Sequence, residues 1–169
     1  MQIRNVTATD ITAIVDIYNQ YILNTVITFE EEIVDEQIME MRIDKVLQTG
    51  LPWLVVEENG KLLGYAYAHL WRERSAYRFS VEPSIYLDPT ATGKGLGKAI
   101  YQALLVRLKQ LGKRNVIGVV TLPNVASERL HESLGFKKVG EFEHVGYKHE
   151  RWLSVGYYQL TFPEHLHDH

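Results

Sequence analysis

The sequence predicts one mixed α/β domain built on a largely antiparallel sheet. Helix-like and strand-like stretches alternate along the 169 residues, and an Asn-Gly turn joins two of the strand-like stretches. Hydrophobic residues make up 46% of the chain, enough for a substantial core in a domain of this length. We expect residues 1–163 to form the domain and the His-rich stretch 164–169 to be a disordered tail.

Charge and composition exclude several classes of function. The net charge of −3 argues against a protein that binds nucleic acid regardless of sequence, and no apolar run approaches the roughly 20 residues of a membrane span. With no signal-peptide pattern either, we expect a cytoplasmic protein. The chain has no cysteine, which excludes disulfides, thiolate metal sites and a cysteine nucleophile. The alternating histidines His165, His167 and His169 have no structured partner, so we expect no functional metal.

The first part of the chain predicts a strand followed by two helices. Residues 2–6 are typical of a short strand. Asp10 is a suitable N-cap for a helix whose apolar residues recur at helical spacing as far as Ile22. Asp35 is a suitable N-cap for a second helix that ends near Thr49. Residues 24–34 match neither pattern, and we expect the acidic stretch 30–36 to be a solvated surface.

The middle of the chain predicts three strands. Two of them, over residues 53–57 and 62–70, flank the Asn59-Gly60 hairpin signal. The third spans residues 79–87 and contains Pro83. Because proline cannot donate to a strand ladder, this strand is expected to have an edge or a bulge there.

The last part predicts a helix that follows Lys98 and runs to Leu111, then a strand over residues 115–122. A short helix over residues 127–133 comes next. Two strands, over residues 137–142 and 154–162, complete the domain before Pro163.

A glycine-rich loop joins the third strand of the middle part to the helix after Lys98. Gly93, Gly95 and Gly97 allow backbone N–H groups to converge on an anion at the positive end of that helix. The Walker pattern fails because Ala99 stands where Ser or Thr is required. The dinucleotide pattern fails in both registers because its last position is not glycine.

Two blocks resemble the GNAT N-acetyltransferases. The stretch 92–97 is similar to the acyl-CoA pyrophosphate loop of that family, and the stretch 124–136 is similar to its Asn-x-x-Ser-x-x-Leu…Gly-Phe helix, at the expected spacing. Six segments resemble the phosphinothricin and methionine sulfoximine N-acetyltransferases: Thr28-Phe29-Glu30, Trp71-Arg72, Val81-Glu82, Leu122-Pro123-Asn124, Arg129-Leu130-His131-Glu132 and residues 146–152. The resemblance implies a GNAT fold, acetyl-CoA as the donor, a small amino-acid-like amine as the acceptor, and a homodimer.

The resemblance also implies where the donor binds. Thr92 replaces the usual Arg or Gln of the loop, and we expect binding to survive with a modest loss of affinity. It implies that the pantetheine arm of CoA pairs with the backbone of Ile85, Tyr86 and Leu87. The side chains of these three residues also suit a hydrophobic core. The pyrophosphate loop comprises Gly93, Lys94, Gly95, Leu96, Gly97 and Lys98. In the second block, the expected CoA contacts are Asn124 and, as a weaker candidate, Ser133. Asn124 can also act as the N-cap of the short helix.

Two residues are candidates for proton transfer. An α-amino group has a pKa of about 8 and must lose a proton before it attacks. Glu82 stands where the family keeps a carboxylate, and it is the candidate general base. Alternatively, it faces solvent or pairs with an arginine. His131 stands where many relatives carry the tyrosine that protonates the departing thiolate; it could also assist Glu82, or be a packed helix histidine.

An amino-acid acceptor needs a cation for its carboxylate, and the stretch 71–78 is rich in arginine. The alternative is a solvated surface loop. The candidate acceptor-binding residues are Phe29, Arg72, Arg74, Tyr77 and Arg78, where Phe29 could equally be core.

Together these features predict direct acetyl transfer from acetyl-CoA to a small amino acid. One alternative is another amine, such as a polyamine, an antibiotic or a protein N-terminus. The other is a non-catalytic acyl-CoA-binding regulator.

Overall fold

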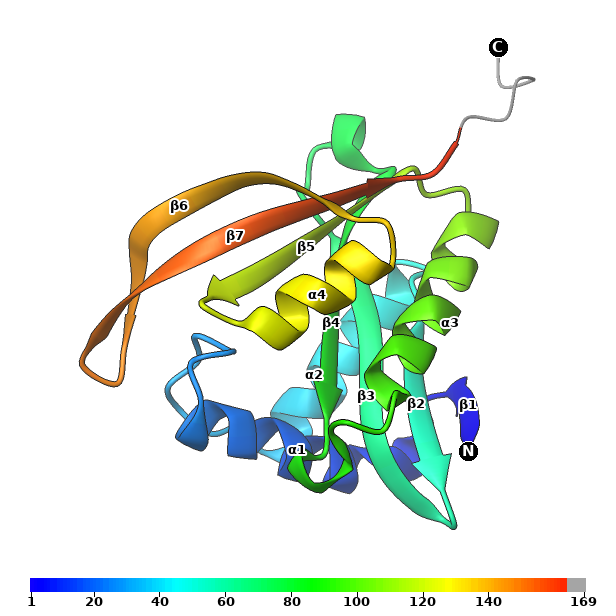
Figure 1. Cartoon of the computed structure of the whole chain (residues 1–169). Helices are drawn as coiled ribbons and strands as arrows, with labels where there is room; N and C mark the ends of the chain where they lie inside the picture. The colour runs from blue at the N-terminus through cyan, green and yellow to red at the C-terminus, as the bar shows by residue number, and fades with distance from the viewer. Residues whose placement is uncertain (164–169) are drawn as a thin grey trace.

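The computed structural model describes residues 1–163 and confirms the predicted mixed α/β fold. Within this range, seven strands form one sheet in the order β1-β2-β3-β4-β5-β7-β6. Helices α1 and α2 cover one face, and α3 and α4 cover the other (Figure 1). No helix among these residues is both long and apolar enough to span a membrane. The predicted tail, residues 164–169, lies outside the described residues.

The N-terminal half follows the sequence prediction closely. It comprises β1 (Gln2–Asn5), α1 (Ile11–Asn24), α2 (Glu36–Gln48), β2 (Trp53–Glu58) and β3 (Lys61–Leu70). Asp35 caps α2 by accepting a hydrogen bond from the Ile38 N–H. Asn59 and Gly60 both have positive φ, as the predicted two-residue hairpin turn requires. Asp10 precedes α1, but its carboxylate binds the Arg4 guanidinium through two 2.8 Å contacts instead of capping the helix.

The prediction of a solvated acidic surface is wrong for Glu30. The Arg42 guanidinium on α2 donates to both of its carboxylate oxygens, at 2.8 and 2.5 Å. The Tyr18 hydroxyl on α1 also donates to Glu30. These partners are distant in sequence, so the acidic pattern alone could not show them. They hold the loop between α1 and α2 against both helices.

The two central strands separate partway along their length. Strand β4 (Ser80–Leu87) pairs with β3 without a register shift from Val81 to Leu87. It pairs with the parallel strand β5 (Asn115–Leu122) only at Ser80 and Val81. Pro83 lies just beyond this pairing, so its missing N–H breaks no regular ladder there. By its order in the sheet β4 is a central strand, and its pairing with β3 has no bulge. It resembles an edge only locally, because beyond Val81 it has no partner on the β5 side.

The C-terminal elements are longer than predicted. They are α3 (Leu96–Gln110), α4 (Val125–Ser133), β6 (Lys137–Lys148) and β7 (Arg151–Thr161). The last two form a hairpin that projects beyond the rest of the sheet (Figure 1) and turns at His149 and Glu150, both with positive φ. Most side chains of β6 are exposed. Without an alternating buried face, the sequence pattern could not reveal the strand's full length.

Candidate active site

The separation of β4 from β5 exposes backbone groups at the centre of the sheet. N–H groups alternate sides along a strand, so about half of those in residues 82–87 point away from β3. The side chain of Tyr86 packs on Tyr18 and Tyr21, with ring centroids 5.1 Å apart in each case. The Leu87 carbonyl accepts a 2.7 Å hydrogen bond from the Tyr21 hydroxyl. The side chains of Ile85, Tyr86 and Leu87 therefore pack against the core, while backbone N–H groups face the opening.

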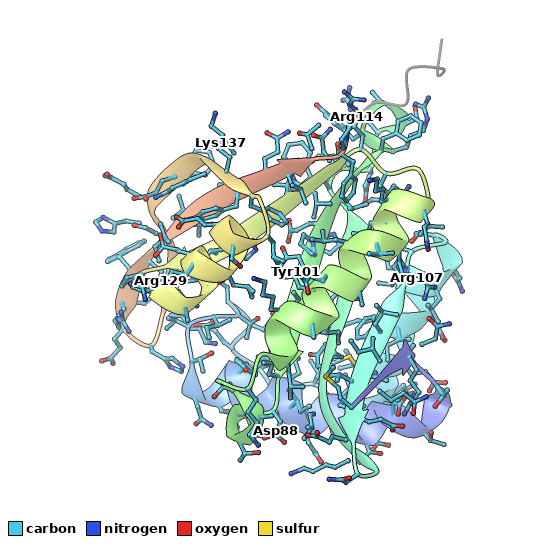
Figure 2. All side chains as sticks on the ribbon, turned by 45° about the vertical axis from the view of Figure 1, so that its right-hand side comes forward. Asp88, Tyr101, Arg107, Arg114, Arg129 and Lys137 are labelled. Atoms are coloured by element: carbon cyan, nitrogen blue, oxygen red, sulfur yellow. The ribbon has the colours of Figure 1, made fainter. Side chains whose placement is uncertain are left out.

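The glycine loop lies at the N-terminus of α3. Asp88, seen near this end of the helix in Figure 2, caps the preceding turn by accepting from the Thr90 N–H. Gly93 and Gly95 have φ of 79° and 78°, a conformation that favours glycine. A Cβ atom at either position would meet nothing within 4 Å, so the loop surface is open. Lys94 and Lys98 are exposed beside it.

The two polar residues predicted on the second block differ in their surroundings. Asn124 precedes α4 and accepts a 3.1 Å hydrogen bond from the Ser127 N–H, which confirms the N-cap alternative. It lies just after the end of β5, the strand that separates from β4. Ser133 donates to the Leu130 carbonyl of its own helix at 2.8 Å. Its hydroxyl is therefore engaged locally.

Glu82 is half-buried on β4 and has a partner that sequence reasoning missed. His69 is directly opposite it on β3, with Nε2 3.3 Å from Glu82 Oε2. The carboxylate raises the pKa of His69 above its ordinary value, against the opposing effect of burial. The sequence suggested an arginine partner. Only the register of β3 against β4 could identify His69.

His131 is buried, with 7% of its surface exposed. Its Nδ1 lies 2.7 Å from the Ser127 carbonyl and therefore carries the hydrogen, so its Nε2 accepts from the Tyr101 hydroxyl at 2.9 Å. Tyr101 projects from α3 toward α4 (Figure 2). Burial lowers the pKa of His131, which favours the neutral imidazole.

A cavity of about 670 Å³ opens on the Glu82 face of the sheet. Trp71, Arg72 and Tyr77 line it from the segment between β3 and β4. Ser80 also lines it, and Ser80 projects to the same face of β4 as Glu82 because side chains alternate along a strand. The opposite wall contains residues that sequence reasoning did not select: Asn115, Ile117, Val139, Gly140, Glu141, Phe142, Tyr157 and Gln159.

The structure separates the three candidate arginines. Arg72 lines the cavity, and its guanidinium lies 4.2 Å from the centre of the Trp71 ring. Arg78 instead donates to the Ser75 carbonyl and lies over the Phe79 ring. Arg74 is exposed and precedes a short 3-10 turn. Neither of these two lines the cavity.

Phe29 lies beside the projecting hairpin. A Cβ atom added at Gly146 of β6 would lie 2.5 Å from the Phe29 ring, so the two residues are in close contact. Phe29 is still 41% exposed. Buried Lys148, also on β6, donates a 2.7 Å hydrogen bond to the carbonyl of Thr28. The hairpin and the loop that carries Phe29 are thus held together.

The family model for the acetyltransferase (GNAT) domain matches residues 3–154. The chain belongs to the GNAT acetyltransferase family. It is 39% identical to a phosphinothricin N-acetyltransferase of Streptomyces viridochromogenes, over 96% of this chain and 88% of that protein. It is 36% identical to an L-methionine sulfoximine/L-methionine sulfone acetyltransferase of Salmonella typhimurium, over 98% of this chain and 96% of that one.

A solved structure agrees with these relatives. The GNAT superfamily phosphinothricin acetyltransferase from Sinorhizobium meliloti, in complex with AcCoA, superposes with a TM-score of 0.92 at 41% identity, covering 95% of this chain and 87% of that chain. The predicted family, fold and N-acetyltransferase class are therefore confirmed. Among residues 1–163, no group of three or more His, Cys, Asp or Glu side chains is arranged to hold a metal ion.

Proposed function

We propose that this enzyme transfers an acetyl group directly from acetyl-CoA to the amino group of a small amino-acid-like acceptor. Phosphinothricin, methionine sulfoximine and methionine sulfone are the acceptor types, in line with the names of the relatives. The observation that carries the proposal is the cavity lined by Arg72, on the Glu82 face of the sheet and next to the opening between β4 and β5.

Acetyl-CoA fits the opening and the glycine loop. We assign its pyrophosphate to the N–H groups of residues 93–98, where Lys94 and Lys98 add positive charge and the helix dipole favours an anion. Its pantetheine arm would lie along residues 85–87 of β4, where unpaired N–H groups can bind it and polarise the thioester oxygen. Asn124 borders the other side of the opening. Ser133 is the weakest donor contact because its hydroxyl is engaged within α4.

Glu82 is assigned as the general base. It accepts a proton from the acceptor's ammonium group, directly or through a water molecule, and the freed nitrogen lone pair attacks the thioester carbon. The C–N bond forms, the C–S bond breaks, and the second proton that the nitrogen loses passes to the departing CoA thiolate, directly or through water, to give CoA-SH. No covalent enzyme intermediate is required, consistent with a chain that has no cysteine.

Arg72 is assigned as the carboxylate-binding residue of the acceptor site. Its guanidinium can bind both carboxylate oxygens and so fix the direction of the amine. Tyr77 lines the same cavity and can bind the polar group at the other end of the acceptor. Phe29 is assigned to the side of the site next to the hairpin, because its ring contacts Gly146 of β6. Arg74 and Arg78 do not line the cavity and are assigned only a contribution to the positive charge of the segment between β3 and β4.

His131 is assigned as a positioning residue for the region where α3, α4 and β5 meet. To protonate the thiolate, His131 would have to be a charged imidazolium, and burial disfavours that form. Both of its ring nitrogens also have hydrogen-bond partners already. The neutral imidazole instead fixes α4, whose first residues follow Asn124.

The protein is proposed to be a cytoplasmic homodimer. The projecting hairpin carries five large apolar side chains that are 55–65% exposed: Val139, Phe142, Val145, Tyr147 and Trp152. Such a group of exposed apolar residues is typical of a protein interface. Sedimentation of the purified protein should give twice the monomer mass of 19.5 kDa.

The proposed function is tested by a turnover screen with acetyl-CoA. The acceptors are phosphinothricin, methionine sulfoximine, methionine sulfone and ordinary amino acids, with spermidine, an aminoglycoside and a peptide N-terminus as controls. We expect turnover with the amino-acid analogues, and Arg72→Ala should raise their KM about tenfold or more without changing the KM for acetyl-CoA. Preference for a control amine would refute the acceptor assignment.

A further inference from the structure

His69 faces Glu82 because of the backbone, not because of a flexible side chain. The two residues are register partners on the antiparallel strands β3 and β4. Directly opposed residues on such strands project to the same face of the sheet. The register thus brings the two side chains together, with His69 Nε2 3.3 Å from Glu82 Oε2. Both lie on the sheet face that carries the acceptor cavity, although neither is among the residues that line it.

The second ring nitrogen of His69 decides which atom can exchange a proton. Nδ1 lies 3.0 Å from the Leu70 carbonyl oxygen, which can only accept, so Nδ1 carries a hydrogen. Nε2 is then the titrating atom, and it faces the carboxylate. The imidazole side chain is 45% exposed, so a proton on it can pass to water.

The charged and titratable groups around His69 come from four elements. Glu82 on β4 is nearest, and Tyr67 lies two residues earlier on the same face of β3. Lys45 on α2 opposes protonation of His69, while Arg42 of α2 and Glu30 of the preceding loop act on Tyr67. Strand β5 carries no charged residue over positions 115–122. The attraction of Glu82 exceeds the opposing effects, so the pKa of His69 is raised.

A glutamate alone is a weak acceptor for an ammonium proton. Transfer from an amine with a pKa of about 8 to an ordinary glutamate, with a pKa of about 4.3, is unfavourable by about 5,000-fold. Transfer to an imidazole with a pKa of about 6.5 is unfavourable by only about 30-fold. A histidine in contact with the carboxylate thus narrows the gap in proton affinity.

We propose that His69 is the positioning and proton-accepting partner of Glu82. This inference rests on the proposed role of Glu82 as general base. An ammonium N–H bond breaks as an O–H bond forms on Glu82, and the same proton then passes to Nε2 of neutral His69. The resulting imidazolium releases its Nε2 proton to water, which restores neutral His69 while Glu82 is again a carboxylate. Turnover therefore requires His69 to be neutral when the acceptor binds.

The test is the pH profile of His69→Gln, measured from pH 5.5 to 9 with methionine sulfone or phosphinothricin and saturating acetyl-CoA. Glutamine retains a hydrogen-bond donor but cannot titrate. We expect kcat at pH 7 to fall about 3–10-fold, the KM for acetyl-CoA to stay unchanged, and the rising limb of the wild-type profile to be lost. His149→Asn is the matched control, since His149 is exposed in the β6–β7 turn and Asn tolerates its positive φ.

Glu82→Gln in the same assay separates the proposed role of His69 from the proposed role of Glu82 as general base. If Glu82→Gln is inactive and His69→Gln keeps the wild-type profile, the role of His69 is overturned while the base assignment stands. If Glu82→Gln keeps wild-type turnover, the base assignment fails and the role of His69 fails with it. A second measurement needs no change at His69: its NMR titration should move to lower pH in Glu82→Gln, and an unmoved titration would contradict the coupling.

Discussion

The two histidines near the reaction centre occupy opposite environments. His69 is half-exposed on an open face of the sheet and faces a carboxylate, which raises its pKa. His131 is buried between α3, α4 and β5 and faces a tyrosine hydroxyl, and burial lowers its pKa. Of these two histidines, only His131 lies at a position of the family motif in the sequence. The comparison shows that a motif position identifies a place in the fold, whereas the partner of a side chain decides whether it can exchange protons.

The largest expected effect is on the pair formed by Glu82 and His69. Glu82→Gln should lower kcat/KM by roughly 10²–10⁴-fold, the usual contribution of a general acid or base. Because Glu82 lies at an open face and is nearly isosteric with glutamine, the melting temperature should change little. Steady-state kinetics and thermal unfolding of the same preparation check both statements. A variant that retains full turnover at neutral pH would remove Glu82 from the mechanism.

The buried histidine should show the reverse pattern. His131→Ala leaves a cavity and an unpaired Tyr101 hydroxyl, so we expect a loss of about 2–4 kcal/mol in the free energy of unfolding. Denaturant unfolding measures this loss. The kcat of the folded enzyme should stay within about tenfold of wild type, since His131 is assigned a positioning role.

Tyr101→Phe is the matched variant, because it keeps the ring and removes only the donor to His131; we expect a loss of about 1 kcal/mol. A fall in kcat of more than a hundredfold for His131→Ala, with stability intact, would instead identify His131 as the acid.

A smaller change at β5 tests how tightly His131 is held. A Cβ atom at Gly118 would lie 2.6 Å from His131 Nε2. Gly118→Ala should therefore displace the imidazole and cost about 1–3 kcal/mol of stability, measured by denaturant unfolding. Gly140→Ala on β6 is the control, since a Cβ there meets nothing within 4 Å. Equal stability of the two variants would show that His131 can move freely.

The smallest effect is a difference between two titrations. By NMR, His69 should titrate above 6.5 and His131 below it. Protonation of the two histidines changes folding stability in opposite directions. The raised pKa of His69 gives a stabilisation that is present below pH 6.5 and is lost as the pH rises through its folded value. The lowered pKa of His131 gives a cost that appears as the pH falls below 6.5. Titration of both at the same pH would contradict the comparison.

The sequence by itself determined the fold class, and its resemblance to known motifs determined the family; the glycine loop as the donor site stays a prediction. The fold class and the loop prediction depend on local information: apolar periodicity for the helices and strands, turn residues such as Asn59-Gly60, and glycines at a helix start where backbone can face an anion. Such signals act over a few residues, so they can be recognised without knowing what packs against them.

The tertiary structure alone decided the partners within the site. It paired Glu82 with His69 through the register of β3 and β4, paired Glu30 with Arg42, and placed Arg72 rather than Arg74 or Arg78 on the cavity. It also extended the β6–β7 hairpin through residues whose exposed side chains carry no strand pattern. Each of these outcomes depends on contacts between residues whose separation in sequence says nothing of their separation in space.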